Sequence, residues 1–150
     1  MKWEFTNDRS LCSQIVETVQ TGILTGVYPP GANMPSVRTL ALEAGVNPNT
    51  MQKALAEMEG QGLLHTQRTS GRTVTTDERL IMKLKERRAA DYIKHYFEGM
   101  QGLGIGRKQA VEMLVYSARQ AGTAKDADTA STDTNPGQRI PTPIGPSEVN

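Results

Sequence analysis

Two short helical segments separated by only three residues narrow the folds open to this chain. The first segment begins after Ser36, whose hydroxyl can accept a hydrogen bond from a free amide of the first turn. It ends at Gly45, and Val46 and Asn47 complete the separation. Asn47 is a good N-cap, and Pro48 takes the first helical position, where its missing N–H costs nothing. This arrangement predicts a helix-turn-helix, whose second helix is the right size for the major groove of DNA.

The second helix of this pair has one apolar and one polar face. Its apolar residues follow the i, i+3, i+4, i+7 spacing of a buried face; they are Met51, Ala54, Leu55 and Met58. Its exposed start carries Asn49, Thr50, Gln52 and Lys53. Amides and hydroxyls can read base edges and a lysine can meet a phosphate, so this polar start predicts a DNA-reading surface.

Elements on either side complete a winged helix-turn-helix. Apolar residues at helical spacing predict a helix from Leu11 that stops at Gly26. The Tyr-Pro-Pro-Gly stretch at residues 28–31 then forces an extended turn, because proline restricts its own backbone and that of the residue before it. After Gly62 the apolar period becomes two, which predicts a β-hairpin with residues 69–71 as a three-residue loop ending in a left-handed glycine.

The predicted hairpin carries two arginines near its loop. In the register expected from this loop, Arg68 and Arg72 face each other across the two strands. Like charges in direct opposition are unfavourable without a counterion, which a DNA phosphate or the minor groove would supply. The alternative is that both arginines extend into solvent.

Five segments of the chain resemble the winged helix-turn-helix of the GntR family of bacterial transcription regulators. These segments are residues 26–31, 34–41, 45–55, 62–64 and 70–72, and the resemblance as a whole covers residues 10–76. The short C-terminal part is similar to that of the YtrA subfamily. This resemblance implies a homodimeric repressor of its own operon, often encoded beside ABC transporter genes, that binds a double-stranded DNA operator.

The resemblance also implies roles for individual residues. Arg38 matches an arginine that reaches a base or a phosphate, Ser36 a phosphate-binding helix cap, and Gly71 the glycine at the wing tip. Together with the polar residues named above, the expected DNA-binding set is Ser36, Arg38, Asn49, Thr50, Gln52, Lys53, Arg68, Ser70, Gly71 and Arg72.

The sequence divides into three parts. Residues 1–76 form the expected DNA-binding domain. Residues 77–121 show two helical patterns, the second from about Arg107 to Arg119, and their apolar stripes favour a dimerisation region that would suit a palindromic operator. The alternative is that both helices fold back on their own domain. Residues 122–150 contain hardly any residue able to build a core, so they are expected to be a disordered tail.

Other classes of protein find little support. Neither His65 nor His95 has a cysteine or another histidine at metal-ligand spacing in the sequence. The glycines of residues 102–106 do not follow a predicted strand, as a dinucleotide-binding loop would, and the sequence offers no activating base for Cys12. We therefore expect no enzyme, no metal and no cofactor. No apolar run is long enough for a signal peptide or a membrane span, and a lone cysteine cannot form an internal disulfide, so the chain is expected to be cytoplasmic.

Two questions stay open at this stage. Residues 1–76 carry six basic and six acidic side chains, which permits a winged-helix module that binds proteins rather than specific DNA. Salt dependence discriminates the two, because phosphate contacts release counterions. The sequence also leaves room for a small-molecule effector of unknown identity.

Overall fold

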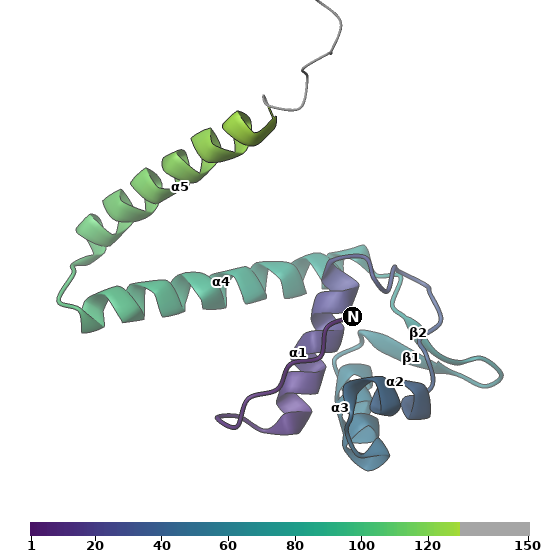
Figure 1. Cartoon of the computed structure of the whole chain (residues 1–150). Coiled ribbons are helices and arrows are strands. Elements are labelled where there is room, and N and C mark those ends of the chain that lie inside the picture. The colour runs from purple at the N-terminus through teal and green to yellow at the C-terminus, as the bar shows by residue number, and fades with distance from the viewer. Residues whose placement is uncertain (130–150) are drawn as a thin grey trace, which may run out of the picture. The chain divides into compact units, whose positions relative to one another are not determined.

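The computed structural model describes residues 1–129, with side chains through residue 123, and shows five helices and one hairpin within that range (Figure 1). The elements are α1 (Leu11–Leu24), α2 (Val37–Ala44), α3 (Pro48–Gly60), β1 (Leu64–Gln67), β2 (Gly71–Val74), α4 (Glu78–Gly102) and α5 (Arg107–Thr129). This confirms the predicted class, a mainly helical winged helix-turn-helix followed by two C-terminal helices.

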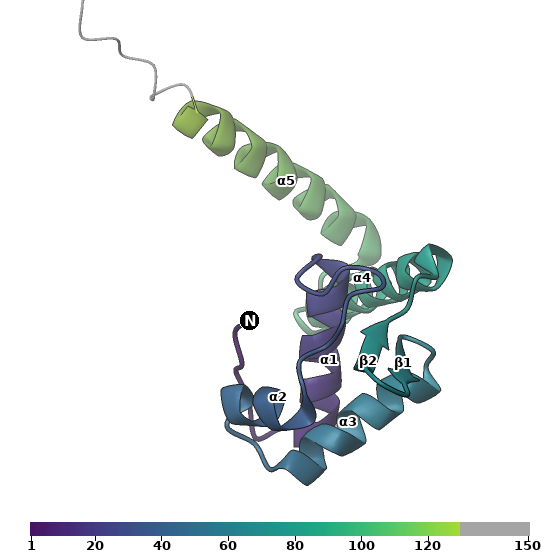
Figure 2. The ribbon, with the colours of Figure 1, turned by 90° about the vertical axis from the view of Figure 1, so that its right-hand side faces the viewer.

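The chain divides into two compact units, the first comprising Met1–Lys94 and the second beginning at His95. In the first unit, α1 and α2 both pack on α3, and α3 also contacts β1 (Figure 2). The fully buried side chains at this junction come from all of these elements; among them are Ile15, Val19, Leu40, Met51, Leu55, Met58, Leu63, Leu64 and Val74. The predicted apolar face of α3 is therefore the centre of the core.

Local caps set the ends of α2 and α3 as expected. Ser36 Oγ accepts a hydrogen bond from the Thr39 amide at 3.1 Å, and Asn47 Oδ1 accepts one from the Asn49 amide at 2.8 Å. Gly45 ends α2 in the left-handed conformation, with φ +66°. Gly45 ends α2 and Asn47 begins α3, so the connection between the two helices is three residues long.

The register of the hairpin differs from the prediction. The strand pairs are Leu64 with Val74, His65 with Thr73, Thr66 with Arg72, and Gln67 with Gly71. The loop is therefore residues 68–70, hereafter the wing loop, and Gly71 already belongs to β2 with φ +75°. Arg68 does not face Arg72, and the predicted opposition of the two arginines is wrong. The register follows from the core, because Leu64 and Val74 are both 1% exposed and must lie together on the buried face.

Residues 31–34, which precede α2, form hydrogen bonds with the free edge of β2. The sequence predicts only an extended turn for this segment. The Met34 amide donates to the Arg72 carbonyl at 2.8 Å, the Val74 amide to the Ala32 carbonyl at 2.9 Å, and the Gly31 amide to the Val74 carbonyl at 3.0 Å. Asn33 forms an isolated bridge with Thr73. The wing, residues 64–74, is thus hydrogen-bonded along both sides of β2.

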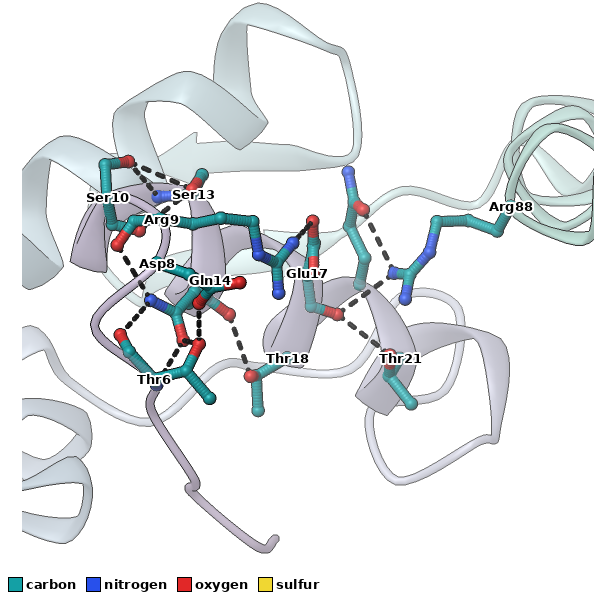
Figure 3. A network of polar contacts seen from close by, with 11 residues as sticks. Thr6, Asp8, Arg9, Ser10, Ser13, Gln14, Glu17, Thr18, Thr21 and Arg88 are labelled. Atoms are coloured by element: carbon teal, nitrogen blue, oxygen red, sulfur yellow. Dashed lines mark hydrogen bonds and ion pairs between the residues drawn. The ribbon is translucent and has the colours of Figure 1, made fainter. Parts of the chain in front are cut away.

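Two glutamines buried on α1 connect it to distant parts of the first unit. Gln14 accepts a hydrogen bond from the Thr6 amide at 2.8 Å and donates to the Thr6 and Arg9 carbonyls, which holds the N-terminal arm (Figure 3). Gln20 accepts from Arg88 Nη1 of α4 at 3.3 Å and donates to Gln61 Oε1 at 2.9 Å. A buried glutamine with satisfied partners links elements that are far apart in sequence.

The first unit includes the beginning of α4. Asp77 caps this helix by accepting hydrogen bonds from the Arg79 and Leu80 amides, at 3.0 and 3.2 Å. Leu80, Ile81 and Leu84 then pack against the core, and for this reason the compact unit extends past residue 76 to Lys94. The boundary drawn from sequence thus lies just before the residues that attach α4.

In the second unit, the end of α4 contacts the start of α5. The Tyr96 hydroxyl donates to the Ala110 carbonyl at 2.7 Å, and the Arg107 guanidinium lies 4.4 Å from the centre of the Phe97 ring. Helix α5 continues to Thr129 and so includes residues 122–129, which the sequence analysis assigned to the beginning of the tail. Residues 122–129 contain no proline, which would break the helix there. The remainder of the predicted tail, residues 130–150, lies outside the described residues.

Candidate nucleic-acid interface

The start of α3 presents a polar surface beside its buried face. Asn49, Gln52 and Lys53 are exposed and Thr50 is half-buried, whereas Met51 in the same turn is fully buried. The buried methionine fixes the rotation of the helix, because the two sets of positions lie on different sides of the same turns. The expected reading residues of α3 are therefore held outward by the core.

Helix α2 brings two more of the predicted residues to the same region. Arg38 is exposed and borders a shallow hollow of about 360 Å³, which is also lined by Ala41, Leu42, Val46 and Pro48. This hollow spans the turn between α2 and α3, so Arg38 lies next to the beginning of α3. Ser36 is exposed, and its hydroxyl lies 2.9 Å from Thr39 Oγ1 in addition to capping α2.

The wing loop presents an exposed arginine, whereas the arginine of β2 is half-buried and forms an ion pair within the protein. Arg68, Ser70 and Gly71 are all exposed. The Arg72 side chain is only 16% exposed and its Nε forms a hydrogen-bonded ion pair with Glu59 Oε1 of α3. The predicted site residues on the wing thus separate into an outward group and one residue that has a protein counterion.

Glu59 is the residue that sequence reasoning missed at this site. Its carboxylate accepts hydrogen bonds from Arg72 and, at 2.9 Å, from Thr66 Oγ1 of β1. Burial alone would raise the pKa of the Glu59 carboxyl, but these hydrogen bonds and the electrostatic interactions with Arg72 and His65 outweigh it and lower the pKa. No sequence signal marked the pair, because Glu59 and Arg72 are thirteen residues apart and lie on different elements.

Residues suited to other chemistry are not gathered into a site in the described part of the chain. Among the described residues, no three His, Cys, Asp or Glu side chains are grouped in a way that could hold a metal ion. Cys12 is half-buried on α1 with its thiol free. None of the helices between residues 1 and 129 combines the length and apolar character that crossing a bilayer requires.

Comparison with known proteins identifies the family. The model of the bacterial regulatory proteins of the gntR family matches residues 11–74. A GntR family transcriptional regulator from Listeria monocytogenes is similar in structure, with a TM-score of 0.69 and 33% sequence identity over 75% of this chain and 98% of that one. YhcF of Bacillus subtilis, an uncharacterised HTH-type transcriptional regulator, is 27% identical over 109 residues, which are 73% of this chain and 90% of YhcF.

A shorter match is to a named repressor. The HTH-type transcriptional repressor YtrA of Bacillus subtilis is 41% identical over 58 residues, or 39% of this chain and 45% of YtrA. The expected family resemblance is thus confirmed by a family model, by relatives and by a solved structure that this chain covers almost completely. The chain belongs to the GntR family of bacterial transcription regulators.

Proposed function

We propose that this regulator is a cytoplasmic, homodimeric repressor that binds a palindromic operator in its own operon and excludes RNA polymerase. The observation that carries the proposal is the exposed polar start of α3, together with exposed Arg38 of α2, which lines the same hollow as Pro48 at the beginning of α3. Two short helices in this arrangement dock with the second helix in the major groove. The printed name of the relative YtrA, a repressor, supports the direction of regulation.

Each residue proposed to contact DNA has an assigned role. Arg38, Asn49 and Gln52 read base edges, because arginine pairs with guanine and amides pair with adenine in the major groove. Lys53 and Arg68 bind phosphates, which position the protein without carrying sequence information. The remaining small residues contact the sugar-phosphate backbone of the DNA; they are Ser36, Thr50, Ser70 and Gly71.

Exposed apolar side chains on α5 support the proposed homodimer. Val111, Leu114 and Val115 are each 44–45% exposed in the single chain. Their spacing puts them on one side of the helix, and an apolar stripe of this kind is typical of an interface. A second copy of the chain would cover the stripe, and the dimer would present two DNA-binding units to half-sites about 34–36 Å apart.

The first experiment measures binding to the DNA immediately upstream of the gene, at two salt concentrations and with random duplex as competitor. We expect tight, salt-sensitive binding that survives the competitor. Arg38→Ala should weaken operator binding by about 1–3 kcal/mol and relax the sequence preference, whereas Lys53→Ala should weaken all sequences alike. Equal losses on operator and random DNA for Arg38→Ala would remove its base-reading role. Salt-insensitive binding, or binding no better than to random DNA, would favour the protein-interaction module instead.

The dimer is tested separately by light scattering after size-exclusion chromatography. Leu114→Lys should convert the dimer to a monomer, because it places a charge in the apolar stripe. Gln120→Lys is the matched control, since it introduces the same charge on the other side of α5 and should leave the dimer intact. A dimer that survives Leu114→Lys would refute the stripe as the interface.

A further inference from the structure

We propose that Arg72 is a positioning residue, which ties the wing to α3 through Glu59 and thereby sets the place of the wing loop relative to the recognition helix. The inference rests on the proposed function, since it concerns how the same DNA-binding surface is assembled. It differs from the expectation drawn from the sequence, in which Arg72 itself contacted DNA.

The geometry of the contact joins three elements at one carboxylate. Arg72 of β2 and Thr66 of β1 are a directly opposed strand pair. Both donate to the same oxygen, Glu59 Oε1, near the C-terminal end of α3. Each strand of the wing is thus hydrogen-bonded to the helix whose other end carries the proposed reading residues.

The outer wing depends on polar contacts for its position. Between residues 65 and 73 no side chain is buried, and the nearest buried side chains are those of Leu64 and Val74. An isolated two-stranded hairpin is at best marginally stable in water, so it needs support from its surroundings. The hydrogen bond from the Met34 amide to the Arg72 carbonyl fixes the edge of β2, and the Glu59 contact is what connects this level of the wing to α3.

Electrostatics oppose a switch of Arg72 from Glu59 to a DNA phosphate. The Glu59 side chain is 30% exposed and stays ionised, so losing Arg72 would leave a partly enclosed carboxylate without its cation beside a polyanion. Arg68 has no such constraint, because it is exposed in the wing loop and makes no ion pair or hydrogen bond among the described residues. Arg68 is therefore the matched arginine against which Arg72 can be compared.

The DNA-binding test compares Arg72→Met with Arg68→Met over a salt series on the upstream DNA. Arg68→Met should reduce the magnitude of the slope of log K against log salt by about 0.9 for each lost phosphate contact, or about 1.8 for the two wings of the proposed dimer. Arg72→Met should leave the slope unchanged and weaken binding by about three- to tenfold, because the wing loop loses its support. A slope lowered by Arg72→Met as much as by Arg68→Met would overturn the proposal, as would an Arg72→Met protein with unchanged affinity.

A second measurement follows amide hydrogen exchange in the wing of the full chain without DNA. Arg72→Met and Glu59→Met should each speed the amide exchange of residues 65–73. The double variant should exchange no faster than the faster single variant, because both substitutions remove the same contact, the ion pair between Arg72 and Glu59. Additive effects, or exchange as slow as in the unmodified protein, would overturn the proposal. Thermal unfolding first verifies that each variant is folded.

The two measurements separate this inference from the function on which it rests. If the unmodified protein fails to bind the upstream DNA specifically, the proposed function fails, while the exchange data still decide whether Arg72 and Glu59 hold the wing. If the unmodified protein binds and Arg72→Met lowers the salt slope, the proposed function stands and the positioning role is refuted.

Discussion

Replacing Arg88 by methionine tests how α4 is attached to the DNA-binding unit. Arg88 Nη1 donates to the Glu17 carbonyl at 3.1 Å and to Gln20 Oε1 at 3.3 Å, both on α1 (Figure 3). Methionine keeps an apolar stem of similar length but donates no hydrogen bond. The change therefore removes the polar contact between the two helices and preserves most of the packing.

The expected loss follows from the burial of the groups left behind. Gln20 is 7% exposed and keeps its hydrogen bond to Gln61, but its Oε1 loses the Arg88 donor. An unsatisfied buried polar atom costs about 1–3 kcal/mol. Because Arg88 is only half-buried, water can replace part of the donor, so we expect the lower part of this range. The free energy of unfolding should fall by about 1–2 kcal/mol.

Urea denaturation of the full chain measures this loss at one fixed protein concentration, because dimer formation would add to the apparent stability. Arg87→Met is the control, since Arg87 is the exposed neighbour on the same helix and undergoes the same chemical change. Its effect should stay within about 0.5 kcal/mol. If Arg88→Met is no more destabilising than Arg87→Met, the reasoning from the two hydrogen bonds is refuted.

Three further outcomes are expected. Leu40→Ala should lower the free energy of unfolding by about 2–5 kcal/mol through the cavity it leaves. Leu42 lies on the same helix but is 84% exposed, so Leu42→Ala should change the free energy of unfolding by less than about 0.5 kcal/mol. Comparable losses for the two variants in urea denaturation would contradict the assigned core. Gly45→Ala should cost about 1–2 kcal/mol, because an alanine must adopt φ +66° although its Cβ meets no atom within 4 Å; an unchanged urea midpoint would argue against the left-handed cap. Because the pKa of Glu59 is lowered in the folded state, the unfolded chain binds the proton first as the pH falls. The contribution of this carboxylate to the free energy of unfolding is therefore complete above its ordinary pKa and is lost as the pH falls through the lowered pKa. Glu59→Gln should make the free energy of unfolding depend less steeply on pH in the acid range, and an unchanged dependence would contradict this.

The helix-turn-helix could be predicted from sequence because its determinants are local. Ser36, Gly45 and Asn47 act on amides and backbone angles within three residues of themselves, so their effect is readable without knowing the rest of the fold. The buried face of α3 follows from a period that any helix must obey. The family resemblance rests on the same segments and is confirmed by the family model over residues 11–74.

The wing register could not be predicted, because the alternation of strand residues is compatible with more than one pairing. A shift of the partner by two residues keeps every side chain on the same face, so a period of two cannot reveal it. Tertiary packing decided the matter by placing Leu64 opposite Val74 on the core and by adding residues 31–34 to the other side of β2. The loop moved accordingly to residues 68–70.

The environment of Arg72 shows the same division between local and tertiary information. The local pattern of residues is enough to predict that a basic hairpin follows the helix pair, and which polar residues the start of α3 carries. The contact of Arg72 with Glu59 of α3 becomes visible only in the folded chain, as does the completion of the first unit by Leu80, Ile81 and Leu84. Helix caps and periodicities act over a few residues, whereas ion pairs and core contacts depend on which distant elements the fold brings together.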